Sequence, residues 1–130
     1  MSLHVPENRW IMIEVNRIYN LRGDEASCKI LVDGLWPRGI KKEDPRIDEW
    51  IREIAPDKDL RKWFSHDPDK WQKFKSAYKK ELEDKRELLD KIREKAKQQD
   101  ITLVYSAKET QYNHAVVLKE ILETHKKEIK

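Results

Sequence analysis

The chain has 130 residues; 41% are charged and 38% apolar, and 28 Lys and Arg against 25 Asp and Glu leave a net charge of +3. This length fits one domain over residues 1–130. Such balanced charge argues against a nucleic-acid partner, because nucleic-acid binding is expected to use a concentrated basic face. A single cysteine excludes an internal disulfide and fits a reducing cytoplasm, where we expect the protein to act. Without an apolar stretch of roughly 20 residues or a secretion signal, we expect no membrane partner.

Two strands are predicted near the N-terminus. Ile11, Ile13 and Val15 alternate within residues 10–19, which is typical of a strand. The apolar run 30–32 is long enough for a buried second strand. The link between them is short for a parallel crossover, so the two strands are antiparallel unless 24–27 forms a compact helical turn. The sequence leaves that choice open.

Helices are predicted from residue 44 to 98. Asp44 and Pro45 are typical of a helix start, and Pro56 of its end. The apolar residues between them follow helical spacing: Ile47, Trp50, Ile51 and Ile54. Asp57 is placed to cap a shorter helix. A third helix starts at Asp67 and Pro68 and is expected to break near residue 84, where its apolar stripe is interrupted.

The C-terminal part of the chain predicts one more strand and one more helix. Residues 101–105 are rich in β-branched and aromatic side chains, and Asn113 is placed as the cap of the last helix. The long helical connection between the second and third strands predicts that these two are parallel. The expected fold is therefore a small α/β domain with about three largely parallel strands and four to five helices.

Polar residues follow both strands that are expected to be parallel. Asp33 and Arg38 follow the second strand, and Ser106, Lys108, Asn113 and His114 follow the third. Because the carboxyl ends of parallel strands meet at one edge of a sheet, these loops should lie together. Arg38, Lys108 and either Lys42 or Arg61 would supply positive charge, so the arrangement predicts a phosphate or carboxylate site.

Each of these residues also has a plain structural interpretation. Asn113 is most often a helix cap, His114 falls on an apolar helix stripe, and His66 stands beside a helix start. The four histidines show no spacing typical of metal ligands, and the chain carries no Walker sequence, GxGxxG or GxSxG. We therefore expect neither a metal nor a cofactor.

The order of several motifs resembles one protein family over about residues 11–122. The matching segments are Ile30-Leu31-Val32-Asp33 with Leu35-Trp36-Pro37-Arg38-Gly39, Leu60-Arg61-Lys62-Trp63-Phe64, His66-Asp67-Pro68, Thr102-Leu103-x-Tyr105-Ser106-Ala107-Lys108 and Asn113-His114-Ala115. This pattern resembles the domain-of-unknown-function 488 family in its short YeaO-like branch, whose members are uncharacterised. The family pattern places Arg after the strand Asp, where this chain has Gly34.

The resemblance implies that seven polar residues stand at motif positions: Asp33, Arg38, Arg61, His66, Lys108, Asn113 and His114. We expect a protein or enzyme that binds a small phosphate- or nucleotide-like anion. In this hypothesis His66 or His114 is the acid or base and Asp33 orients one of them, while Arg38, Arg61, Lys108 and Asn113 hold the anion. The alternative is a non-enzymatic module that binds protein or nucleic acid through the charged helices of 68–98.

Overall fold

The computed structural model describes residues 12–128. Its sheet has four strands in the order β1-β4-β2-β3: β1 (Ile13–Arg17), β2 (Cys28–Leu31), β3 (Glu49–Trp50) and β4 (Ile101–Tyr105). Every pairing is parallel, including that of β2 with β4. The α/β class and the parallel sheet are thus confirmed, while the expectation of about three strands is wrong by one.

The relation between the first two strands follows from the position of β4. This strand lies between β1 and β2 and is parallel to both, so β1 and β2 run in the same direction without pairing with each other. The central strand β4 is buried along its whole length, which is typical of a strand covered on both faces.

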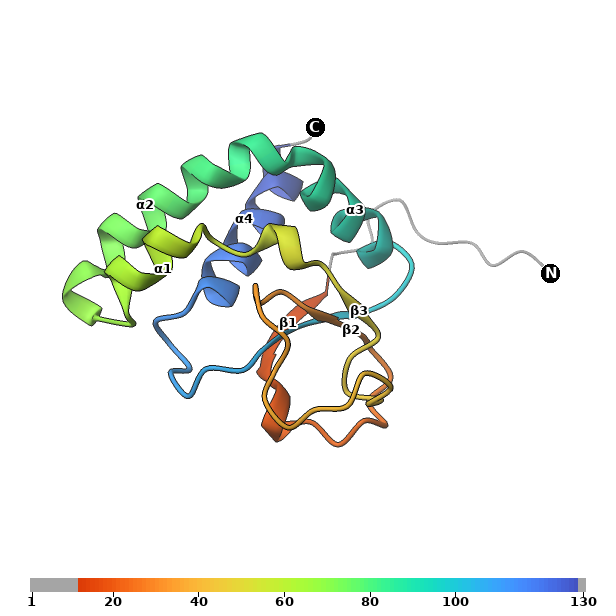
Figure 1. Ribbon diagram of the computed structural model, residues 1–130. Coiled ribbons are helices and arrows are strands. Elements are labelled where there is room, and N and C mark those ends of the chain that lie inside the picture. The colour runs from red at the N-terminus through yellow and green to blue at the C-terminus, as the bar shows by residue number, and fades with distance from the viewer. Residues whose placement is uncertain (1–11, 129–130) are drawn as a thin grey trace.

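Four α-helices are present in the described part of the chain: α1 (Lys58–Phe64), α2 (Trp71–Leu82), α3 (Arg86–Ala96) and α4 (His114–Glu128). Figure 1 shows them gathered on one side of the sheet, with the loops that follow β1 and β2 on the other. A 3-10 turn at Glu83–Lys85 separates α2 from α3, as the interrupted stripe predicts. None of the described helices combines the length and the apolar character needed to cross a membrane.

The additional strand, β3, stands where the sequence predicts a helix. Glu49 and Trp50 pair with β2, and a 3-10 turn follows at Arg52–Ile54. Asp44 caps no helix here, because it instead accepts hydrogen bonds from the backbone and side chain of Arg46. Asp57 does precede α1, but its side chain makes no capping bond.

The core is divided by the sheet into two clusters. The larger one lies under the helices and includes Phe74 and Tyr78 of α2 together with Leu118 of α4. The smaller one lies on the opposite face of the sheet, on the side of the loops. It contains Ile18, Leu21, Leu31 and Val104, with Trp36, Ile40, Ile47 and Trp50 packed against it. The loop after β2 therefore packs against the smaller cluster through Trp36 and Ile40, at the carboxyl ends of the central strands.

Candidate functional site

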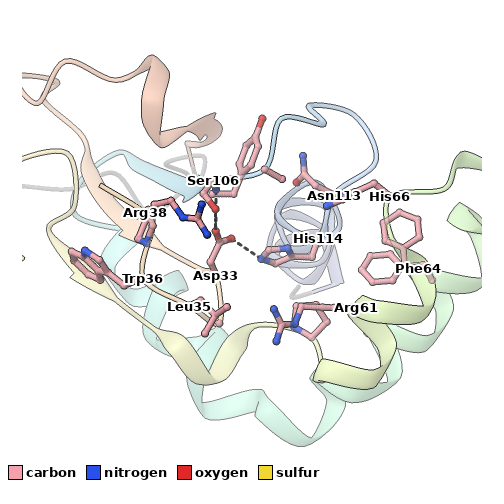
Figure 2. Close-up of a pocket in the computed structure, with 16 residues that line it drawn as sticks. Asp33, Leu35, Trp36, Arg38, Arg61, Phe64, His66, Ser106, Asn113 and His114 are labelled. Atoms are coloured by element: carbon pink, nitrogen blue, oxygen red, sulfur yellow. Dashed lines mark hydrogen bonds and ion pairs between the residues drawn. The ribbon is translucent and has the colours of Figure 1, made fainter. Parts of the chain in front are cut away.

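A cavity of about 390 Å³ opens at the carboxyl ends of β2 and β4. Figure 2 shows its walls, which come from the loops after these two strands, from the region of α1, and from the start of α4. Sixteen residues line it: Asp33, Gly34, Leu35, Trp36, Pro37, Arg38, Pro56, Arg61, Phe64, His66, Phe74, Tyr105, Ser106, Ala107, Asn113 and His114. Open α/β sheets commonly bind their ligands at this edge.

Asp33 joins the two strand-end loops. Its Oδ2 accepts hydrogen bonds from the backbone nitrogen of Ser106 at 2.9 Å and from Ser106 Oγ at 2.7 Å. Its Oδ1 lies 3.4 Å from Nε2 of His114. The carboxylate, with an exposed side-chain fraction of 14%, therefore connects the end of β2 to the loop after β4 and to the first turn of α4.

His114 is held in one tautomer. Its Nε2 lies 3.0 Å from the carbonyl oxygen of Val32, and because a carbonyl can only accept, this nitrogen carries the proton. Burial, which disfavours the imidazolium, lowers the pKa of His114 from its ordinary value of 6.5, although the Asp33 carboxylate and the Val32 carbonyl act in the opposite direction. The positive charges of Arg61 and His66 lower the pKa further. The ring is thus kept neutral and packs against the edge of Tyr78.

Arg61 and Arg38 bring positive charge to opposite walls of the cavity (Figure 2). Within the described residues, neither side chain forms an ion pair or a hydrogen bond with a protein group. The Nε atom of Arg61 is buried without a partner. Arg38 is exposed, whereas Arg61 is partly buried beside Gly34, where a Cβ added to the glycine would lie 3.6 Å from Cζ of Arg61.

His66 stands at the end of α1 on an unusual backbone. Ser65 and His66 both have a positive φ, 45° and 56°, although neither is a glycine. Such residues cost roughly 1–2 kcal/mol each and occur preferentially at functional sites. Nδ1 of His66 donates to the carbonyl oxygen of Tyr112 at 2.8 Å, since that carbonyl can only accept. This bond fixes the ring at the wall of the cavity.

Asn113 has the structural role that its position indicates. Its Oδ1 accepts hydrogen bonds from the backbone nitrogens of Ala115 and Val116, and its Nδ2 donates to the carbonyl of Glu109. The amide thus caps α4, although the residue also borders the cavity. Lys108 is exposed and does not line the cavity. The other six polar residues predicted from the sequence all line it.

Sequence reasoning assigned no role to several lining residues that shape the cavity. Ser106 is the partner of Asp33, Gly34 leaves room for Arg61, and Phe64 and Tyr105 supply buried aromatic wall. Ser106 was expected at the sheet edge, because it directly follows the predicted third strand, but no role in the site was assigned to it. The apolar character of Phe64 and Tyr105 gave no means of distinguishing a cavity wall from the core.

No metal centre is visible in the part of the chain that the structure describes, since it contains no cluster of three or more His, Cys, Asp or Glu side chains placed to hold an ion. Cys28 is half-buried, and burial raises the pKa of its thiol. The chemistry offered by the cavity is therefore that of two guanidinium groups, two imidazoles, one carboxylate, one amide and the hydroxyl groups of Ser106 and Tyr105.

Comparison with known proteins relates the chain to an uncharacterised group. A family model described as "Inactive DUF488-N3 subclade" matches residues 12–130. The uncharacterised protein YeaO of Escherichia coli K12 is 42% identical over 106 residues, which cover 82% of this chain and 92% of YeaO. The uncharacterised protein Rv3073c of Mycobacterium tuberculosis is 34% identical over 110 residues, covering 85% and 92% of the two chains. No solved structure matches.

Proposed function

This chain belongs to the DUF488 family, in its inactive DUF488-N3 subclade, and from that membership and the cavity we propose that it binds a small phosphate- or nucleotide-like anion at its strand ends. The ligand occupies the cavity of about 390 Å³, near the lower end of the range typical of small-molecule sites. The half-buried free thiol of Cys28 fits a reducing compartment, and we place the binding in the cytoplasm.

The observation that carries this proposal is the pair of guanidinium groups at the cavity. Arg38 and Arg61 both line it, and in the described part of the chain no carboxylate pairs with either of them. Buried polar groups are nearly always hydrogen-bonded, yet Nε of Arg61 has no protein partner. Arginine binds phosphate and carboxylate through charge-assisted bonds, so an anion in the cavity would neutralise the Arg61 guanidinium, and Arg38 adds positive charge from the opposite wall.

We favour binding over catalysis because of how Asp33, Ser106 and His114 are connected. An activated serine donates its hydroxyl proton toward a base such as histidine. Here Ser106 Oγ donates to Asp33, and Nε2 of His114 donates to the Val32 carbonyl. These hydrogen bonds hold loops together and leave the serine without a histidine base. The description of the matched subclade as inactive agrees with this interpretation.

The charged helices α2 and α3 have partners within the fold. Lys75 of α2 pairs with Glu120 of α4, and Lys91 and Lys95 of α3 both pair with Glu49 of β3. These ion pairs connect the helices to the sheet and to α4. They give part of this charged surface a structural role, so we do not adopt the interaction-module hypothesis.

A thermal-shift screen tests the proposed function. Wild-type protein is heated with phosphate, sulfate, nucleoside monophosphates and sugar phosphates, in parallel with a double variant Arg38→Gln/Arg61→Gln and the control Lys62→Gln. Lys62 lies on α1 beside Arg61 but outside the cavity. Ligand at 100 times its dissociation constant stabilises by about 2.7 kcal/mol, which raises the melting temperature by several degrees. We expect this rise in the wild type and the control but not in the double variant; no rise with any anion would contradict the proposal.

A further inference from the structure

We propose that the anionic group of the ligand sits between Arg61 and His66, and that the ligand is the phosphate monoester of a compact hydroxylated molecule whose hydroxyl groups face Asp33 and Ser106. This inference rests on the proposed function, and it assigns the two ends of the cavity different chemistry. Two properties distinguish these ends, namely their charge and the hydrogen-bonding capacity that remains unused.

The end formed by Arg61 and His66 is cationic. Arg61 is partly buried there, and its Nε, shielded from solvent, has no protein acceptor among the described residues. The three basic side chains at this end lie close enough that Arg61 and His66 each disfavour a proton on His114, in addition to the larger effect of burial on that pKa. Asp33, the one acid of the lining, lies 3.4 Å from His114 and bonds the loop after β4, but it pairs with neither Arg61 nor His66. A dianion here would meet the Arg61 guanidinium, which no carboxylate of the described residues pairs with, whereas the carboxylate of Glu109 interacts with His66 from outside the cavity lining.

His66 is already oriented to contact such an anion. Because its Nδ1 donates to the Tyr112 carbonyl, Nε2 is the ring nitrogen left for a ligand, and it has no hydrogen-bond partner within the described residues. Neutral Nε2 accepts the proton of a phosphate monoanion, and protonated Nε2 donates to the dianion, so either state makes one bond. The left-handed backbone at Ser65 and His66 holds the imidazole at the cavity wall at a conformational cost that packing elsewhere must offset.

The end formed by Asp33 and Ser106 is suited to hydroxyl groups. The Asp33 carboxylate repels an anion, and the exposed Arg38 lies on the same side of the cavity without pairing with it (Figure 2). Oδ2 of Asp33 accepts two bonds from Ser106, which leaves Oδ1 with accepting capacity, and the Ser106 hydroxyl that donates to Asp33 can still accept. A hydroxyl group, which donates and accepts at once, matches this pair. Phe64, which packs against His66, and Tyr105, which precedes Ser106, provide aromatic wall for the carbon skeleton.

Calorimetric titration with three probes tests the inference: inorganic phosphate, ribose 5-phosphate and ribose. We expect ribose 5-phosphate to bind more tightly than phosphate, and ribose more weakly than either. Arg61→Gln should weaken phosphate binding about tenfold or more, the scale of one lost charge-assisted hydrogen bond. Arg38→Gln, which removes the same charge from the other end, should change phosphate affinity by less than about threefold, as expected for an exposed charge.

His66→Asn provides a matched test of the imidazole. Asparagine tolerates the left-handed backbone, and its amide can replace the donor to the Tyr112 carbonyl, but it lacks the second ring nitrogen. We expect an unchanged melting temperature and a phosphate affinity at least about threefold weaker. If the melting temperature falls as well, His66→Gln, which retains a polar group near the Nε2 position, should restore phosphate binding. Unaltered affinity in both variants would exclude His66 from the anion site.

The outcomes separate this inference from the proposed function. Phosphate binding that is lost in Arg38→Gln and retained in Arg61→Gln would overturn the placement of the anion and leave the anion-binding function intact. Ribose 5-phosphate binding no more tightly than phosphate would overturn the assignment of the hydroxyl end alone. Failure of the wild type to bind either phosphate or ribose 5-phosphate, while it binds another anion, would overturn the ligand class. Failure to bind any anion would overturn both proposals.

Discussion

Asp33 at the end of β2 accepts two hydrogen bonds from Ser106 at the end of β4, through one carboxylate oxygen, at 2.9 Å and 2.7 Å. The two residues are 73 positions apart in the chain, so this contact closes the long crossover made by α1, α2 and α3. It also fixes the edge of the sheet from which the cavity opens. The same carboxylate can therefore be tested for its effect on stability, separately from any effect on a ligand.

Replacing Asp33 should destabilise the fold. Asp33→Ala leaves the backbone nitrogen and hydroxyl of Ser106 without their acceptor, and partly buried hydrogen bonds to a charged group are worth about 1.5–3 kcal/mol. We expect a loss of about 2 kcal/mol in the free energy of unfolding, measured by urea denaturation. Asp59→Ala, at an exposed carboxylate of α1, is the control and should change it by less than about 0.5 kcal/mol. Equal effects of the two substitutions would show that the Asp33 contacts contribute little.

Stability should depend on pH through His114. Its pKa in the folded protein lies below the ordinary 6.5, mainly because of burial. Between these two values the unfolded chain binds the proton and the folded chain does not, so the contribution of His114 is fully present above pH 6.5 and is lost as pH falls through the folded pKa. We expect the free energy of unfolding to decrease from pH 7 toward pH 5.

A variant and a separate pH window identify the group responsible. His114→Gln keeps an N–H for the Val32 carbonyl but cannot titrate, so it should flatten the decrease between pH 7 and 5. Glu25 and Asp44 have pKa values of about 2, so their contributions are lost only below about pH 4.5. If the free energy of unfolding still decreases between pH 7 and pH 5 in His114→Gln, another residue is responsible for the decrease.

Two glycines should respond in opposite ways to alanine. Gly23 has a φ of 103°, and an added Cβ would lie 2.8 Å from Cγ of Pro45, so Gly23→Ala should destabilise by more than about 1 kcal/mol. At Gly34 an added Cβ meets Ala55 and Arg61 at ordinary contact distances of 3.5 and 3.6 Å. Gly34→Ala should leave stability unchanged or raise it by about 0.4–1 kcal/mol, as measured by denaturant midpoint. A large loss at Gly34 would mean that this loop needs glycine for another reason.

Tyr78 packs against His114, one of the residues that line the cavity. Its side chain is fully buried, packs edge-on against His114, and donates a hydrogen bond of 2.7 Å to the carbonyl of Ile54. Tyr78→Phe keeps the ring and removes the donor, so we expect a loss of about 1–3 kcal/mol, the cost of an unsatisfied buried acceptor. Differential scanning calorimetry of the two proteins measures it. An unchanged melting temperature would show that water or another donor replaces the hydroxyl.

The fold was predictable where the sequence pattern of a segment corresponds to a single secondary-structure element or to a clear break between two. Residues 101–105 became the fully buried β4, and the interrupted stripe at residue 84 became the 3-10 turn between α2 and α3. The helix predicted at 45–54 was wrong because its apolar residues divide between two clusters on opposite faces of the sheet. Ile47 and Trp50 pack against the smaller cluster on the loop side of the sheet, whereas Ile51 and Ile54 belong to the larger cluster on the helix side. Spacing alone cannot distinguish such a division from one helical stripe.

The candidate site was partly predictable for a topological reason. Asp33 and Ser106 follow parallel strands that are neighbours, so their proximity follows once the strands are known. Lys108 also lies in a strand-end loop but is exposed outside the cavity, because the path of a loop depends on contacts that the local sequence does not specify. The unpartnered Nε of Arg61 depends on the packing of α1 beside Gly34, which no sequence pattern indicates.

The most direct test of anion binding at the strand ends is a nuclear magnetic resonance titration of the wild-type protein with inorganic phosphate. We predict saturable shifts of backbone amide signals confined to the cavity lining and largest around Arg61 and His66, and we expect the variant Arg61→Gln to need about tenfold more phosphate, or more, for the same shifts. Shifts confined to the exposed faces of α2 and α3, or no saturable shift at any residue, would contradict the account.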